Sequence, residues 1–400
     1  MKSNSSLVRA AVGAAILAVT AGVAFAATPK EQKAIVITAN GGPEVLKLQS
    51  IPVLEPGKDQ VLIKVYAAAV NPVDWKMRQG MGGMGAGAAP GGEGMGGGAP
   101  AGAPAGGAPG AGGPPGGGEG MGGAPAGGGA AAFSPSVPGM DVAGVVEKVG
   151  PGVTTLKVGD AVFSMIGRGG VTGLNGGYSQ YVVAPAANVI SKPKNLSYAE
   201  AAGLGTAGMT GDRAINTADI QKGQRVFING IAGGVGSAAA QVAKAKGAYV
   251  IGTASAKHNA YLKSIGVDEV IDYTKVQFED AIKQPVDVAI ETVGAETATR
   301  ALKIIKKGGK LISVAGSPGA DACAAAGVVC PAGGPPGANG PTEGQLLAEV
   351  GKLASEGKYK VNVDASFPLD KAADAQEENR NGGTSGKIII NVDAAQAGKK

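Results

Sequence analysis

The glycines Gly230, Gly233, Gly234 and Gly236 are spaced like a turn whose backbone could hold a phosphate group. Spacing alone is weak evidence, because 71 of the 400 residues are glycine. The flanking sequence is more informative: a β-branched and aromatic run (RVFI, 225–228) precedes the turn, and helix-forming residues follow it at 237–246. A glycine turn between a strand and a helix presents N–H groups to a pyrophosphate. We therefore predict a dinucleotide site that includes Gly230, Gly233, Gly234, Val235 and Gly236.

The residues after the next expected strand, 249–253, indicate which dinucleotide binds. A site for NAD usually places Asp or Glu there, to accept hydrogen bonds from the ribose hydroxyls. Here no acid occurs before Asp268, and Ser255 and Lys257 are suited to a 2′-phosphate. The sequence therefore predicts NADPH as the cofactor. The alternative is that Lys257 and His258, the only histidine of the chain, begin a solvated helix.

Composition and cysteine usage limit the other classes of function. The net charge of +5 is spread along the chain without a basic run, so we expect no nucleic-acid partner. Cys323 and Cys330 are the only cysteines. Two cysteines without a nearby histidine do not make a zinc site, so we predict no metal there; whether they form a disulfide is open.

The first 26 residues have the features of an export signal. Lys2 and Arg9 give a positive start, an apolar run follows, and Ala24 and Ala26 flank a cleavage-type pattern. We expect a mature protein that starts near Ala27, exported to the periplasm or the cell exterior, with no stable membrane span. An uncleaved leader would instead anchor the protein in a membrane.

A segment at 80–132 consists almost entirely of glycine, alanine, proline and methionine, and Glu93 and Glu119 are its only charges. We expect a disordered surface loop, because such a composition buries too little apolar surface to compensate for its backbone entropy. A smaller segment at 331–341 has the same character. Its role, like that of the longer one, is open.

Between these segments the chain has ordered patterns. Strand-like runs at 34–37, 61–66, 142–149 and 180–184 indicate a β-rich domain. Strands and helices then alternate, which predicts an α/β fold with a doubly wound parallel sheet. The expected strands are 270–273, 286–290, 310–314 and 387–392, and the expected helices are 295–305 and 343–356.

Six short motifs occur in the order in which one known family has them. They are AVNPVD at 69–74, PGMDVAG at 138–144, VGDAVF at 158–163, GGYSQY at 176–181, IDY at 271–273 and SGKI at 385–388. With them, the chain resembles the zinc-independent medium-chain dehydrogenase/reductases, in the NADPH-dependent quinone oxidoreductase (zeta-crystallin-like) branch. The resemblance covers nearly everything from Lys33 to Val392 outside the low-complexity segments.

The resemblance implies a β-rich, GroES-like catalytic domain with an inserted Rossmann domain. We expect a signal peptide at 1–26, the catalytic domain at 27–190, the Rossmann domain at 191–344 and a return to the catalytic domain at 345–400. It also implies that Asn71 lies beside the nicotinamide and that Thr210 contacts the cofactor, although Asn71 could instead complete the turn before Pro72 and Thr210 could serve helix packing. The remaining cofactor residues that it implies are Tyr273, Val293, Gly294, Ala315 and Gly316.

Two departures from the family pattern concern the substrate pocket. Lys76 stands where relatives often have a tyrosine, and the low-complexity segment follows where the pocket wall is expected. Residues that bind zinc in other members are replaced here by Asn71 and Met140, so a metal-assisted mechanism is not expected.

Two functions of different classes are compatible with the sequence. The first is hydride transfer from NADPH to a quinone or an α,β-unsaturated carbonyl, without zinc. The second is an exported nucleotide-binding protein with little turnover, which acts as a sensor or surface component through its glycine-rich segment. A homodimer is open in either case.

Overall fold

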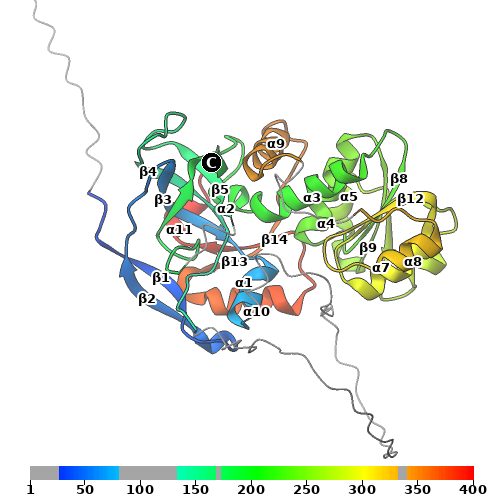
Figure 1. Ribbon diagram of the computed structural model, residues 1–400, viewed down its shortest axis with the longest axis horizontal. Helices are drawn as coiled ribbons and strands as arrows, with labels where there is room; N and C mark the ends of the chain where they lie inside the picture. The colour runs from blue at the N-terminus through cyan, green and yellow to red at the C-terminus, as the bar shows by residue number, and fades with distance from the viewer. Residues whose placement is uncertain (1–26, 81–132, 168–172, 332–339) are drawn as a thin grey trace, which may run out of the picture.

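The computed structural model describes residues 27–80, 133–167, 173–331 and 340–400. It contains two main sheets, one on each side of a layer of helices (Figure 1). The expected export signal, most of the segment at 80–132 and most of that at 331–341 lie outside the described residues. Among the described residues, no helix combines the length and apolar character needed to cross a bilayer.

The first sheet is built from both ends of the chain. Its order is β13-β14-β3-β4-β5-β7, and β6 pairs with β3 outside this path. Strand β14 runs antiparallel to β3, with Ile389 opposite Ala69. The strands are β3 (Gln60–Ala69), β4 (Asp141–Val149), β5 (Ala161–Met165), β6 (Tyr181–Pro185), β7 (Val189–Ser191), β13 (Val363–Pro368) and β14 (Lys387–Asn391).

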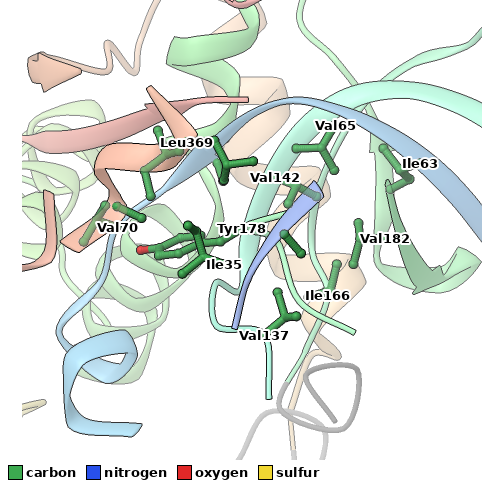
Figure 2. Packing of buried hydrophobic residues seen from close by; sticks show 14 of the residues in the cluster. Ile35, Ile63, Val65, Val70, Val137, Val142, Ile166, Tyr178, Val182 and Leu369 are labelled. Atoms are coloured by element: carbon green, nitrogen blue, oxygen red, sulfur yellow. The ribbon is translucent and has the colours of Figure 1, made fainter. Parts of the chain in front are cut away.

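An antiparallel pair, β1 (Glu31–Ile37) and β2 (Leu46–Pro52), covers part of this sheet. Alternate residues of the strands point into two cores, one on each face of the sheet: Ile388 and Ile390 belong to the first and Ile389 to the second. Tyr178 belongs to the first core together with Ile35 and Leu369 (Figure 2). Its ring is fully buried, and its hydroxyl finds a polar partner in the site described below.

The second sheet is parallel throughout, with the order β10-β9-β8-β11-β12. Its strands are β8 (Arg225–Asn229), β9 (Tyr249–Ala254), β10 (Glu269–Asp272), β11 (Val286–Glu291) and β12 (Ile305–Ser313). Successive strands are added outward from β8 on one side and then from β11 on the other. The strand order therefore reverses between β8 and β11, which confirms the predicted doubly wound sheet.

Helices cover this second sheet and join it to the first (Figure 1). Helix α4 (Gly234–Ala245) follows the glycine turn, and α3 (Gly205–Ala218) packs tightly against it. The approach is close because Gly211 has no side chain: a β-carbon there would lie 2.7 Å from the β-carbon of Ala238. The other helices are α1 (Pro72–Arg78), α2 (Tyr198–Ala202), α5 (Asn259–Ser264), α6 (Phe278–Ala281), α7 (Ala295–Ala301), α8 (Ala320–Ala326), α9 (Glu343–Ser355), α10 (Ala372–Asn381) and α11 (Ala394–Ala397).

One local expectation needs correction. The helix expected at 295–305 ends at Ala301; a single 3-10 turn follows, and β12 begins at Ile305, five residues before the strand was expected. Cys323 lies on α8 and forms a disulfide with Cys330, a pairing that the sequence left open. Helices α1 and α10 were not anticipated at all.

Candidate cofactor and active site

The glycine turn lies between β8 and α4, as the sequence predicted, and each glycine there has a different physical role. Gly230 has φ +71°, a conformation that L-residues with side chains rarely adopt. A β-carbon on Gly236 would lie 2.3 Å from the carbonyl oxygen of Gly230, so this glycine is required for packing inside the turn. Gly233 is different, because a β-carbon there would meet only the Gly230 oxygen, at 3.5 Å.

Gly233 therefore stands next to open space at the N-terminus of α4. Its backbone is extended, with φ −69° and ψ 172°, and it is the residue immediately before the helix. Among the described residues, no contact requires a glycine at this position, so the space beside it is open to a ligand. Gly234 and Val235 follow as the first two helical residues, and both are half-buried. N–H groups of this first turn and the helix dipole favour an anion there.

A buried polar network fixes the carboxyl ends of three neighbouring strands. The Asn229 amide donates to both carboxylate oxygens of Glu291, at 3.2 and 3.0 Å, and accepts from the Thr253 hydroxyl. The same Thr253 hydroxyl accepts from the Gly230 N–H at 2.9 Å. Thr253, Asn229 and Glu291 lie on β9, β8 and β11 and are nearly inaccessible to solvent. The network thus holds the glycine turn against the point where the strand order reverses.

The loops that follow β11 and β12 lie at the same edge of the sheet. Glu291 accepts hydrogen bonds from the Val293 and Gly294 N–H groups, at 2.6 and 3.2 Å, and this fixes the first loop. The Val293 side chain is 45% exposed although it is apolar. Ala315 and Gly316 in the second loop are half-buried, and a β-carbon on Gly316 would lie 2.8 Å from the Ala295 nitrogen. The structure thus brings these four predicted residues to the edge at which α/β sheets bind ligands.

The residues predicted to select the 2′-phosphate, Ser255 and Lys257, follow β9, and Tyr273, predicted only as a cofactor residue, follows β10. Ser255 is half-buried and precedes a 3-10 turn, while Lys257 is exposed. The Lys257 ammonium lies close to the loop at Gly383, where a β-carbon would be 3.3 Å from it. Tyr273 is 58% exposed. His258 is buried, and burial, aided by Lys257, lowers the pKa of its imidazole.

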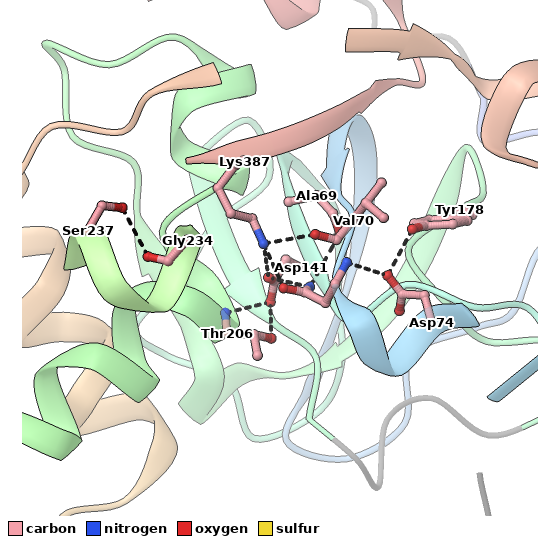
Figure 3. Close-up of polar contacts among 10 residues, drawn as sticks. Ala69, Val70, Asp74, Asp141, Tyr178, Thr206, Gly234, Ser237 and Lys387 are labelled. Carbon is pink, nitrogen blue, oxygen red and sulfur yellow. Dashed lines mark hydrogen bonds and ion pairs between the residues drawn. The ribbon is translucent and has the colours of Figure 1, made fainter. Parts of the chain in front are cut away.

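Asn71 is the centre of a second, buried network. Its partners Asp141, Lys387 and Asp74 are labelled in Figure 3. The Asn71 side-chain amide group donates to Asp141 at 2.8 Å, and its oxygen accepts from the Lys387 ammonium at 2.6 Å. Asp141 also accepts from the backbone N–H and the hydroxyl of Thr206, at 2.8 and 2.7 Å, and so caps the N-terminus of α3. Asn71 is only 3% exposed and its amide is already engaged at both ends.

Asn71 also precedes helix α1, where it forms a capping box with Asp74. The Asp74 carboxylate accepts from the Asn71 backbone N–H and from the Tyr178 hydroxyl, both at 2.8 Å. Burial raises the pKa of Asp74 to about 7, although these two hydrogen bonds act in the opposite direction. Burial also raises the pKa of Asp141 and lowers that of Lys387, and the attraction between the two charges opposes both shifts.

Of the residues in this network, sequence reasoning named only Asn71 as a site residue. Lys387 and Thr206 were not named as site residues, whereas Thr210, which was, is half-buried one helical turn beyond Thr206. A signal existed for Lys387, because it is the one charged residue at the start of an otherwise apolar strand. Within the described residues, no group of three His, Cys, Asp or Glu side chains is arranged to hold a metal ion.

A Rossmann sheet joined to a β-rich domain from both chain ends is the architecture of a two-domain, nucleotide-dependent dehydrogenase or reductase. Comparison with known families agrees with this class. Residues 123–194 match the alcohol dehydrogenase GroES-like domain, and residues 265–390 match a family described as zinc-binding dehydrogenase. In this chain the positions of Asn71 and Met140 provide neither a thiolate nor an imidazole for such a metal.

Individual relatives narrow the class to one branch. An NADPH-dependent alkenal/one oxidoreductase of Arabidopsis thaliana is 33% identical over 376 residues, covering 92% of this chain and 81% of the relative. A quinone oxidoreductase of Sus scrofa is 32% identical, covering 90% and 98%. The solved quinone oxidoreductase of Coxiella burnetii superposes with a TM-score of 0.70 at 30% identity, over 91% of this chain and all of that one. The chain belongs to the medium-chain dehydrogenase/reductase family, in its quinone oxidoreductase branch.

Proposed function

We propose that this protein reduces quinones or α,β-unsaturated carbonyl compounds with NADPH as the hydride donor, without zinc. The observation that carries the proposal is the open space beside Gly233, at the N-terminus of α4 and at the edge where the strand order reverses. The relatives support the choice of reaction, because they are named as alkenal/one and quinone oxidoreductases.

The residues present fit NADPH. The first turn of α4 would hold the pyrophosphate. Ser255, Lys257 and Tyr273 would surround the adenosine 2′-phosphate. The loops at Val293 to Gly294 and at Ala315 to Gly316 would surround the nicotinamide. When bound, NADPH supplies the hydride and the protein supplies orientation. Exposed Val293 and Val314 give this edge an apolar lining, suited to a flat ring.

The substrate that accepts the hydride must carry a carbonyl group that makes the attacked carbon electrophilic. Addition of hydride to a carbon conjugated with a carbonyl moves an electron pair onto the carbonyl oxygen, and a proton from solvent completes the reduction. Oxidation of a simple alcohol instead requires a base or a Lewis acid at the hydroxyl. Asn71 would contribute as a side chain held in one orientation beside the site. Its oxygen accepts from Lys387, and its nitrogen donates to Asp141 and lies 3.4 Å from the Ala69 carbonyl oxygen.

The direct test is oxidation of NADPH by purified protein in the presence of ortho-quinones and enones. We expect turnover with these acceptors, less with NADH, and none with a primary alcohol and NADP⁺. Tight NADPH binding without turnover on any acceptor would support the alternative of an exported nucleotide-binding protein, which the relatives do not favour. Efficient oxidation of the alcohol, or zinc found at one equivalent per chain, would overturn the zinc-independent mechanism.

Export and dimerisation remain parts of the proposal. The features of residues 1–26 and the disulfide between Cys323 and Cys330 support an oxidising compartment. Export can be tested by fusion of residues 1–26 to a reporter that is active only after export. Dimerisation can be tested by light scattering of the purified protein.

A further inference from the structure

Lys387 is a buried cation with partners from a distant part of the chain. It is the first residue of β14 and is 6% exposed. Its ammonium donates to the Val70 carbonyl at 2.9 Å and to the Asn71 side-chain oxygen at 2.6 Å (Figure 3). A buried lysine is costly unless its charge is compensated. Here Asp141 provides the compensation, with a carboxylate oxygen 4.0 Å from the ammonium.

The same residue adjoins the predicted cofactor turn. The preceding Gly386 donates its N–H to the Ala232 carbonyl at 2.8 Å and pairs with Gly233 in an isolated bridge. A β-carbon on Gly234 would lie 3.0 Å from the δ-carbon of the Lys387 side chain. The stem of Lys387 thus packs against the start of α4 while its ammonium reaches Asn71.

Opposite charges on its two sides fix the orientation of the Asn71 amide. Its oxygen faces the Lys387 ammonium, and its NH₂ group faces the Asp141 carboxylate. Rotation of the amide by half a turn would place hydrogens against the cation and oxygen against the anion, and both hydrogen bonds would be lost. Neutral partners that both donate and accept would allow either orientation.

We propose that Lys387 is a positioning residue for the reduction, which sets the Asn71 amide and the start of α4 in one geometry. The expected effects on kcat rest on the proposed function, whereas the expected effects on the orientation of Asn71 do not. The carboxylates of Asp141 on β4 and Asp74 on α1 are the charged groups that face the Lys387 ammonium, and both favour its protonated form, whereas burial opposes it. Loss of the Lys387 proton would leave the Asp141 carboxylate without its cation.

The kinetic test compares Lys387→Met and Lys387→Arg with a matched control. Lys192 is 8% exposed and its ammonium donates to backbone carbonyls, those of Pro193 and Leu196, with no contact to Asn71. Lys192→Met therefore removes a comparably buried lysine elsewhere. We expect Lys387→Met to lower kcat by about 10- to 100-fold with a smaller change in KM for NADPH, because misplacement of a reacting group by about 1 Å can cost about 100-fold. Lys192→Met should leave kcat within about twofold.

The pH profile separates positioning from mere packing. In the wild type, kcat should fall on the basic side as Lys387 loses its proton. Lys387→Arg should retain at least a tenth of the kcat and lose that basic decline, because a guanidinium stays charged. Equal kcat for wild type and Lys387→Met, or the same basic decline in Lys387→Arg, would overturn the proposal.

An NMR readout needs no turnover. The side-chain NH₂ signals of Asn71, assigned by their absence in Asn71→Asp, should move with pH as Lys387 titrates. They should shift in Lys387→Met and lose the basic titration in Lys387→Arg, and Lys192→Met should leave them in place. Unchanged chemical shifts of the Asn71 NH₂ signals in all Lys387 variants would refute the positioning role. If the wild type turns over no acceptor, the proposed function fails, and the NMR result still decides the role of Lys387.

Discussion

Two alanine substitutions three residues apart should affect different properties of this protein: Gly236→Ala should lower its stability, and Gly233→Ala should lower its affinity for NADPH. Gly236→Ala places a β-carbon 2.3 Å from the Gly230 carbonyl oxygen and 2.7 Å from the α-carbon of Ile231. Ordinary contacts start at 3.4 Å, so the overlap with backbone exceeds 1 Å and the turn must move. Forcing extra volume into a packed site costs about 1–3 kcal/mol. For a chain of this length, we expect a fall in melting temperature of roughly 1–4 °C.

Gly233→Ala should leave the fold almost unchanged. The backbone at this position, φ −69° and ψ 172°, suits any L-residue, and the new methyl group meets only the Gly230 oxygen at 3.5 Å. Alanine restricts the unfolded chain, which stabilises by about 0.4–1 kcal/mol. It is also a poorer residue than glycine just before a helix, which costs a similar amount. The free energy of unfolding should therefore stay within about 1 kcal/mol of wild type.

NADPH affinity should nevertheless fall in Gly233→Ala, because the methyl group occupies the space beside the first turn of α4. A displacement of the pyrophosphate should weaken binding about 10- to 100-fold, or 1.4–2.8 kcal/mol. Fluorescence titration with NADPH and thermal melts of both variants measure the two effects separately. Wild-type affinity in a stable Gly233→Ala protein would refute the pyrophosphate position, and a destabilised Gly233→Ala would refute the packing analysis.

Three further predictions concern other parts of the molecule. Lys257→Ala should weaken NADPH binding by about 1.5–3 kcal/mol in equilibrium titrations and leave NADH binding unchanged, whereas Lys263→Ala on α5 should affect neither. Burial raises the pKa of Asp74 from 3.8 to about 7, so between these pH values the folded protein keeps a proton that the unfolded chain has released. The free energy of unfolding should therefore decrease as the pH rises through this range. Denaturant titrations should show a weaker decrease for Asp74→Asn. Cys323→Ser opens a loop of eight residues, closed by the bond to Cys330, and should cost about 2 kcal/mol in the same titrations; an unchanged midpoint would show that the disulfide does not constrain the unfolded chain.

The local features of this fold were predictable from the sequence, and the long-range ones were not. The glycine turn could be located because strand, turn and helix are adjacent in the chain, and the expected strands 270–273 and 286–290 correspond closely to β10 and β11. The helix at 295–305 was extended too far, because apolar periodicity continues across the 3-10 turn into β12. Sequence patterns carry no information on where a turn of this kind interrupts them.

The contacts of Asn71 show why long-range features could not be predicted from the sequence. Its residue type and its place before Pro72 suggested either a cofactor contact or completion of a turn. The structure gives it the second role, as the residue that precedes α1 in a capping box with Asp74, and the cofactor contact stays a prediction. Its side chain meets Lys387, which is 316 positions away, and Asp141, which is 70 positions away. Only the pairing of β14 with β3 and of β3 with β4 brings these residues together. No local pattern encodes such a register.

The position of this network indicates why the protein keeps charges in its interior. Replacement of a buried ion pair by apolar residues of similar size is often neutral or stabilising, so stability alone is a weak reason to retain Lys387 and Asp141. An apolar pair could fill the same volume, but it could not distinguish the oxygen of the Asn71 amide from its nitrogen, nor cap the N-terminus of α3 at Thr206. A cation on one side and an anion on the other make that distinction. Because α3 packs on α4, the same carboxylate that orients Asn71 also ties the first sheet to the helix that follows the glycine turn.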